Sequence, residues 1–91
     1  MTEIEVHTVQ RSGERLLIEV SLRGHRYDVT VSDADAAALA GDSTPEKLVA
    51  ESFRYLLERE PASSILPRFD LSVIEGFFPG YRAEIAARLK R

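Results

Sequence analysis

The chain contains no cysteine and only two histidines among its 91 residues. Without cysteine there is neither a disulfide framework nor thiol chemistry, so packing alone must hold the fold together. With two histidines, a zinc site would need carboxylate ligands, which are uncommon in structural zinc sites. Neither His7 nor His25 has a serine or cysteine nucleophile placed beside it by the sequence. We therefore expect no metal, no cofactor and no catalytic residue.

Long apolar runs are also missing, since none approaches the roughly 20 residues of a membrane span. The first residues lack the basic and apolar regions of a signal peptide. We expect a cytoplasmic protein that does not enter a membrane. The net charge of −3 argues against nucleic acid as a partner, because binding phosphates requires a basic surface. A basic cluster does occur near the C-terminus, where the helix dipole favours positive charge in any case: Arg82, Arg88, Lys90 and Arg91.

What is present predicts one α+β domain over residues 1–91, with a sheet at 3–32 and helices at 33–90. In the first part, apolar and polar residues alternate with a period of two, which is typical of strands. A two-residue turn at Arg23-Gly24 sets the apolar residues of the second and third strands opposite one another. The result is a three-stranded antiparallel meander in the order 1-2-3. Its apolar face consists of Ile4, Val6, Leu16, Ile18, Val20, Tyr27, Val29 and Val31.

The first hairpin has two possible turns. A two-residue turn at Ser12-Gly13 would place Val6 opposite Glu19 and spoil the apolar face. A three-residue loop at 11–13, with Gly13 in the left-handed position of a bulge, pairs Val6 with Ile18 instead. We expect the second arrangement.

Helical signals dominate the rest of the chain. Ser32 can cap a short alanine-rich helix that stops at Gly41, and the next helix begins at Pro45 and ends before Pro61. Two shorter helices are expected at 71–77, capped by Asp70, and at 81–89. This helical C-terminal half is predicted to pack on the apolar face of the meander.

Residues 53–85 contain the segments LLEREP, SIL, FDLSVI and FPGY in that order. This stretch resembles a family of small uncharacterised bacterial proteins, whose members are similar in length and also begin with a strand-rich half. Gly80 departs from the family pattern, which has an acidic residue between the proline and the tyrosine. The resemblance implies a bacterial, stand-alone protein and implies no activity.

Two surfaces are candidate partner sites. On the outer face of the meander, the expected registers place Glu5, Glu19 and Asp28 side by side, with Arg15 and Arg26 nearby. Like charges in such a row repel one another, so it is either a site for a cation or basic partner or simply a solvated face. The second surface is the aromatic cluster after the long helix, which is either core or a partially exposed binding patch: Phe69, Phe77, Phe78 and Tyr81.

These observations favour a non-enzymatic interaction module that binds a protein partner or a second copy of itself. The free edges of strands 1 and 3 would permit sheet extension. One alternative is an antitoxin-like, nucleic-acid-associated dimer, which would need a basic stripe that the strands lack. The other is a small enzyme, which would need a pocket of converging polar groups.

Overall fold

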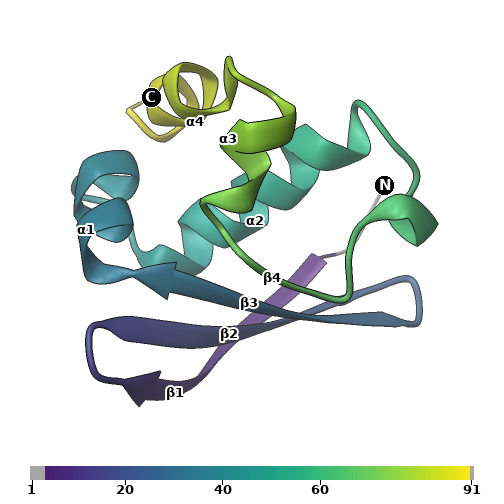
Figure 1. Ribbon diagram of the computed structural model, residues 1–91, viewed down its shortest axis with the longest axis horizontal. Coiled ribbons are helices and arrows are strands. Elements are labelled where there is room, and N and C mark those ends of the chain that lie inside the picture. Colours follow the sequence, from purple (N-terminus) through teal and green to yellow (C-terminus); the bar gives the residue numbers. More distant parts are fainter. Residues whose placement is uncertain (1–3, 91) are drawn as a thin grey trace.

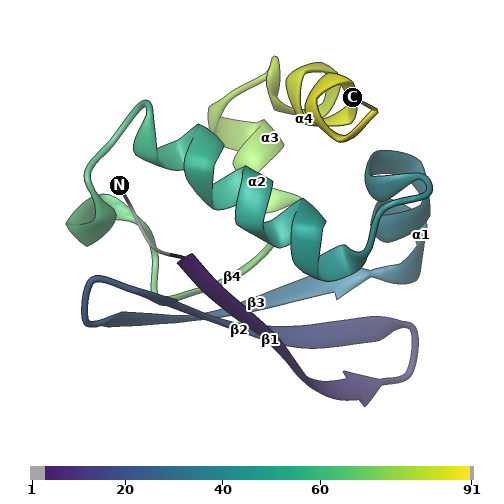
Figure 2. The ribbon, with the colours of Figure 1, turned by 180° about the vertical axis from the view of Figure 1, so that it is seen from behind.

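The computed structural model describes residues 4–90 and shows an α+β fold in two layers (Figure 1). One layer is a four-stranded sheet in the order β1-β2-β3-β4, and the helices lie together on one of its faces (Figures 1 and 2). The strands are β1 (Ile4–Ser12), β2 (Arg15–Leu22), β3 (His25–Ser32) and β4 (Arg68–Asp70). The helical elements are α1 (Asp33–Asp35), η1 (Ala36–Ala40), α2 (Pro45–Leu57), η2 (Ala62–Ser64), α3 (Val73–Phe77) and α4 (Tyr81–Leu89).

The hairpin between β2 and β3 has the predicted turn and register. Arg23 and Gly24 both have positive φ, 50° and 83°, as the two central residues of a type I′ turn require. Leu22 therefore lies opposite His25, and Val20 lies opposite Tyr27. Most apolar residues of both strands face the helices, which confirms this part of the predicted apolar face. Leu16 is partly buried there, and the others are buried: Ile18, Val20, Leu22, Tyr27, Val29 and Val31.

The predicted loop of the first hairpin is wrong. The turn residues are Gly13 and Glu14, with Ser12 opposite Arg15, and Gly13 has the positive φ of 62° that was expected of it. This turn alone would leave the apolar residues of β1 opposite polar residues of β2. A bulge at Val9 brings apolar residues of the two strands opposite one another again, so that Val6 lies opposite Val20. The predicted partner of Val6 was Ile18.

The second half of the chain is not entirely helical, because β4 adds a parallel strand to β3. The backbone N–H of Asp28 donates to Pro67 O at 2.8 Å, and that of Leu71 donates to Thr30 O at 2.8 Å. β4 has only three residues, and its single inward side chain, Phe69, is half-buried. An alternation this short leaves little periodic signal in the sequence. β3 is consequently a central strand, and the predicted free edge at strand 3 does not exist.

The predicted starts of the first two helical segments are confirmed, whereas the helix expected at 71–77 begins at Val73 and is not capped by Asp70, which lies in β4. Ser32 Oγ accepts from the N–H of Asp35 at 3.1 Å, and Thr44 Oγ1 accepts from the N–H of Lys47 at 3.1 Å. Gly41, with a φ of 57°, ends the first helical segment, whose last turn is π-helical. The longest helix, α2, has 13 residues. Among residues 4–90, no helix has the length and apolar content needed to cross a bilayer.

The core lies between the sheet and α2. Its fully buried side chains come from β2, β3, α2, the segment after β4, and α4: Ile18, Val20, Leu22, Val29, Val31, Leu48, Val49, Phe53, Leu71, Tyr81 and Ile85. Tyr27 connects this core to η2. Its hydroxyl donates to Ala62 O at 2.7 Å, which fixes η2 near the N-terminal end of β3. The segment from η2 to α3 is thereby held against the rest of the molecule.

Candidate functional site

The predicted acidic row is only partly present on the outer face of the sheet. Glu19 and Asp28 are direct neighbours, as expected. Glu5, however, lies opposite Ser21, and His7 takes the position beside Glu19. The moved turn of the first hairpin and the bulge at Val9 together cause this change, since both alter the register between β1 and β2 from the one predicted.

Arginines neutralise the acidic side chains around this row. Arg26 pairs with Glu19 at 2.5 Å and Arg68 pairs with Asp28 at 3.4 Å, while β4 brings Asp70 within 2.5 Å of Arg15. Arg26 therefore pairs with a member of the row, whereas Arg15 pairs with Asp70, which lies outside it. Among the described residues, no three acidic or histidine side chains gather to hold a metal ion. This face is a set of ion pairs and not a bare acidic surface.

The four residues of the aromatic cluster have different environments, and Phe69 is half-buried. Tyr81 is buried, with 1% of its surface exposed, so it is a core residue and cannot contact a partner. Phe78 is half-buried against the core. Phe77 is 70% exposed. Of the two alternatives for this cluster, core holds for Tyr81 and exposure holds for Phe77, with Phe78 between them.

Phe77 borders an apolar groove with a volume of about 200 Å³. The groove lies between the C-terminal end of α2, the segment that links η2 to β4, and α3. Its apolar lining consists of Leu56, Ile65, Leu66, Phe69, Val73, Ile74, Phe77 and Phe78. Its polar lining consists of Glu60 and Ser64.

Local chain geometry explains why this groove stays open. α2 ends at Leu57, shortly before Pro61, and Pro67 precedes β4, so the chain between the two prolines is short and carries only the single turn η2. α3 contains five residues and directs Ile74 into the core, which turns Val73 and Phe77, four positions apart, away from it. Leu66, half-exposed at 50%, points outward from the linking segment next to buried Ile65.

The exposed apolar side chains are concentrated here. Among residues 4–90, the large hydrophobic residues that remain exposed are Val9, Leu66, Val73 and Phe77. Three of these four line the groove, and only Val9, in the bulge of β1, lies elsewhere. Sequence reasoning missed Leu66 and Val73, because apolar residues in short helical segments are usually core. The available signal was that α3 is apolar on both sides, more than a small core can cover.

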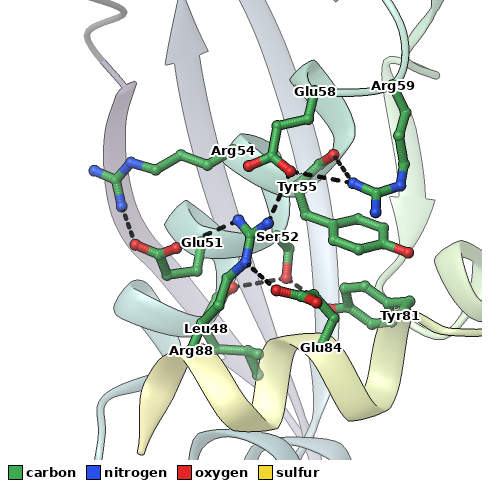
Figure 3. A network of polar contacts seen from close by, with 10 residues as sticks. All are labelled: Leu48, Glu51, Ser52, Arg54, Tyr55, Glu58, Arg59, Tyr81, Glu84 and Arg88. Atoms are coloured by element: carbon green, nitrogen blue, oxygen red, sulfur yellow. Dashed lines mark hydrogen bonds and ion pairs between the residues drawn. The ribbon is translucent and has the colours of Figure 1, made fainter. Parts of the chain in front are cut away.

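α4 is fixed to α2 by a separate polar network (Figure 3). Arg88 donates to Glu58 at 2.8 Å and to Glu84 at 2.9 Å, and lies 3.9 Å from Glu51. The hydrogen bond from Arg88 lowers the pKa of Glu58 below its ordinary value. In the same interface, the guanidinium of Arg59 stacks on the ring of Tyr55, 3.6 Å from its centroid.

This network accounts for much of the predicted basic cluster at the C-terminus. Arg88 is occupied by glutamates, and Arg82 pairs with Asp35 at 3.3 Å and Glu75 at 3.5 Å. Lys90 is exposed, and Arg91 lies outside the described residues. The arginines of α4 therefore hold the helices together, so they do not form an open cationic surface.

Comparison of the chain with protein-family models, with curated proteins and with solved structures found no match. The resemblance of residues 53–85 to a family of small bacterial proteins therefore stays a prediction. The candidate site rests on the geometry of the groove.

Proposed function

We propose that this protein is a non-enzymatic interaction module that binds a protein partner through the apolar groove beside α3. The observation that carries the proposal is the gathering of three of the four exposed large hydrophobic residues of the described chain in one groove. Isolated exposed hydrophobic residues are normal on protein surfaces, whereas contiguous ones mark interaction sites.

Energetics support a docking role for Phe77. Complete burial of a phenylalanine side chain contributes roughly 1.5–3 kcal/mol. Because 70% of Phe77 is exposed in the isolated chain, most of this gain is still available to a partner that covers it. Aromatic residues beside small pockets are also the side chains that contribute most to protein interfaces.

The lining of the groove favours binding over chemistry. Glu60 and Ser64 are its only polar residues, so the groove offers no array of converging acid, base and nucleophile. The antitoxin-like alternative receives no support from α4, whose Arg82 and Arg88 are engaged with carboxylates. A cytoplasmic location and the absence of a nucleic-acid partner remain part of the proposal.

The test uses Phe77→Ser with Val9→Ser as its matched control, because Val9 is similarly exposed but lies outside the groove. Tagged wild-type protein and both variants are used to capture partners from a lysate of the source organism. We expect a partner retained by the wild type and by Val9→Ser, and its affinity for Phe77→Ser to fall at least about tenfold, as for an interface anchor. Equal retention of every partner by all three proteins would refute the groove as the binding site.

A further inference from the structure

We infer that the groove selects a protein segment in which a large apolar side chain lies next to a lysine or arginine. This inference rests on the proposed function and adds the chemistry of the partner. It comes from a single acidic residue in the lining, Glu60, whose carboxylate is not used by the fold.

Glu60 is the charged residue of the groove lining and is half-buried there, just before Pro61. Its backbone N–H donates to Leu56 O at 2.8 Å, which fixes its position at the end of α2. Within residues 4–90, its carboxylate has neither a hydrogen-bond donor nor a cation. The neighbouring glutamates differ, since Glu58 pairs with Arg88 at 2.8 Å and Glu75 pairs with Arg82 at 3.5 Å.

The position of this charge sets a preference for the ligand. A carboxylate beside an apolar wall loses hydration when a ligand covers the wall, and this loss is a cost unless the ligand supplies a cation. A lysine or arginine next to the apolar anchor would compensate for it, in surroundings where the attraction is less screened than in open water. An acidic residue at the same place would be repelled, so the charge also provides selectivity.

The size of the groove indicates an anchor side chain and not a free small molecule. Pockets for whole small ligands usually enclose roughly 300–1,000 Å³. The groove, at about 200 Å³, is smaller than that range. It suits one large apolar side chain that projects from a protein segment and packs on lining residues such as Phe77 and Leu66.

The inference is tested by selecting displayed random peptides against the immobilised full chain and measuring the affinity of the best synthetic peptide. We expect the selected peptides to share a large apolar residue with a lysine or arginine nearby. Their affinity should fall roughly tenfold for Glu60→Gln, as for the loss of one charge-assisted contact. It should fall further for Phe77→Ser, and it should be unchanged for Glu14→Gln, which alters an exposed glutamate outside the groove.

The outcomes separate this inference from the proposed function. Peptides that need Phe77 but show no basic preference, or that bind Glu60→Gln as tightly as wild type, would overturn the inference and leave the interaction module standing. Selection of no peptide that distinguishes wild type from Phe77→Ser would overturn both. Light scattering that shows a dimer dissolved by Phe77→Ser would identify a second copy as the occupant and also overturn the inference.

Discussion

At the scale of single residues, the buried hydrogen bond between Ser52 and Tyr81 has a defined direction. The Ser52 hydroxyl donates its one proton to Leu48 O at 2.7 Å, so the Tyr81 hydroxyl, 2.6 Å from Ser52 Oγ, must be the donor to it. Burial raises the pKa of Tyr81 far above its ordinary value, which keeps this donor protonated. The two residues join α2 to α4 in the core.

This direction predicts unequal effects of the two truncations. Ser52→Ala leaves the Tyr81 hydroxyl buried without an acceptor, at a cost of about 2–3 kcal/mol in the free energy of unfolding. Tyr81→Phe leaves Ser52 bonded to Leu48 and should cost about 1 kcal/mol. The double variant should be more stable than Ser52→Ala alone. Urea unfolding measures all three, and a Tyr81→Phe variant less stable than Ser52→Ala would contradict the assignment.

Arg88 is expected to matter far more than other surface arginines. Its side chain is only 16% exposed and it bonds Glu58 and Glu84. Arg88→Met should lower the free energy of unfolding by roughly 1–2 kcal/mol, because Glu84 loses its pair with Arg88 and Glu58 keeps only the longer pair with Arg59, at 3.3 Å. The control Arg54→Met, which loses one exposed pair with Glu51, should change it by less than about 0.5 kcal/mol. Equal losses in thermal or urea unfolding would rule out a special role for the Arg88 network.

At the scale of elements, β4 is held to the sheet by its last residue as well as by its backbone. Thr30 donates to Asp70 Oδ1 at 2.6 Å, and the hydroxyl of Ser72 donates to Oδ2 at 2.6 Å. Partial burial alone would raise the pKa of Asp70, but the hydrogen bonds from Ser72 and Thr30, with the charge of Arg15, hold it below its ordinary value.

Because the folded state lowers the pKa of Asp70, the contribution of Asp70 to the free energy of unfolding depends on pH. The stabilisation by Asp70 is fully present above the unfolded-state pKa of about 3.9 and is lost as the pH falls through the lower folded-state value. Asp70→Asn should therefore destabilise the protein by roughly 1 kcal/mol at pH 7. The difference in free energy of unfolding between Asp70→Asn and wild type should stay constant down to about pH 5 and then vanish under more acidic conditions. Urea unfolding across this range is the measurement, with exposed Asp42→Asn as a control that should match wild type throughout.

The elements also show how far sequence reasoning reaches. The β2–β3 hairpin was predictable residue by residue, because Arg23-Gly24 leaves one turn that keeps both strands apolar on the same face. The register between β1 and β2 was not predictable. The turn is in a different place and β1 has a bulge at Val9, and the two changes together leave the same residues on the apolar face, so the apolar pattern cannot distinguish the two registers. β4 could not be recognised, because three residues form a strand only where β3 offers a free edge.

At the scale of the whole molecule, the sheet should differ in local stability from its centre to its edge. Val6 and Val20 lie opposite one another, but β2 is central and β1 is an edge strand. In an antiparallel pair, only every second residue forms backbone hydrogen bonds with the strand opposite, and the residues between point their N–H groups away from it. The N–H of Val20 points to β3, and the N–H of Val6 points to the free edge of the sheet. Amide hydrogen exchange should be slow at Val20 and fast at Val6. Similar protection of both amides would mean that something covers the edge of β1.

The candidate site illustrates a different limit on sequence reasoning. Its exposed aromatic residue, Phe77, was within reach of prediction, because a small chain cannot bury every aromatic residue. Leu66, Val73 and Glu60 were not, because their meeting depends on how β4 and α3 pack, which local patterns do not encode. The acidic row was more visible in the sequence, and arginines from β3 and β4 pair with two of its members.

The parallel strand β4 has a consequence for the order of folding. Thr30 and Asp70, hydrogen-bonded across β3 and β4, are 40 positions apart, whereas the turns of the meander close over two residues. Short loops close faster, so the meander can form while β3 still has an open edge. Arrival of β4 covers this edge and also brings Phe69 to line the groove. A newly made chain therefore forms the groove and covers an edge open to pairing with another strand in the same folding step.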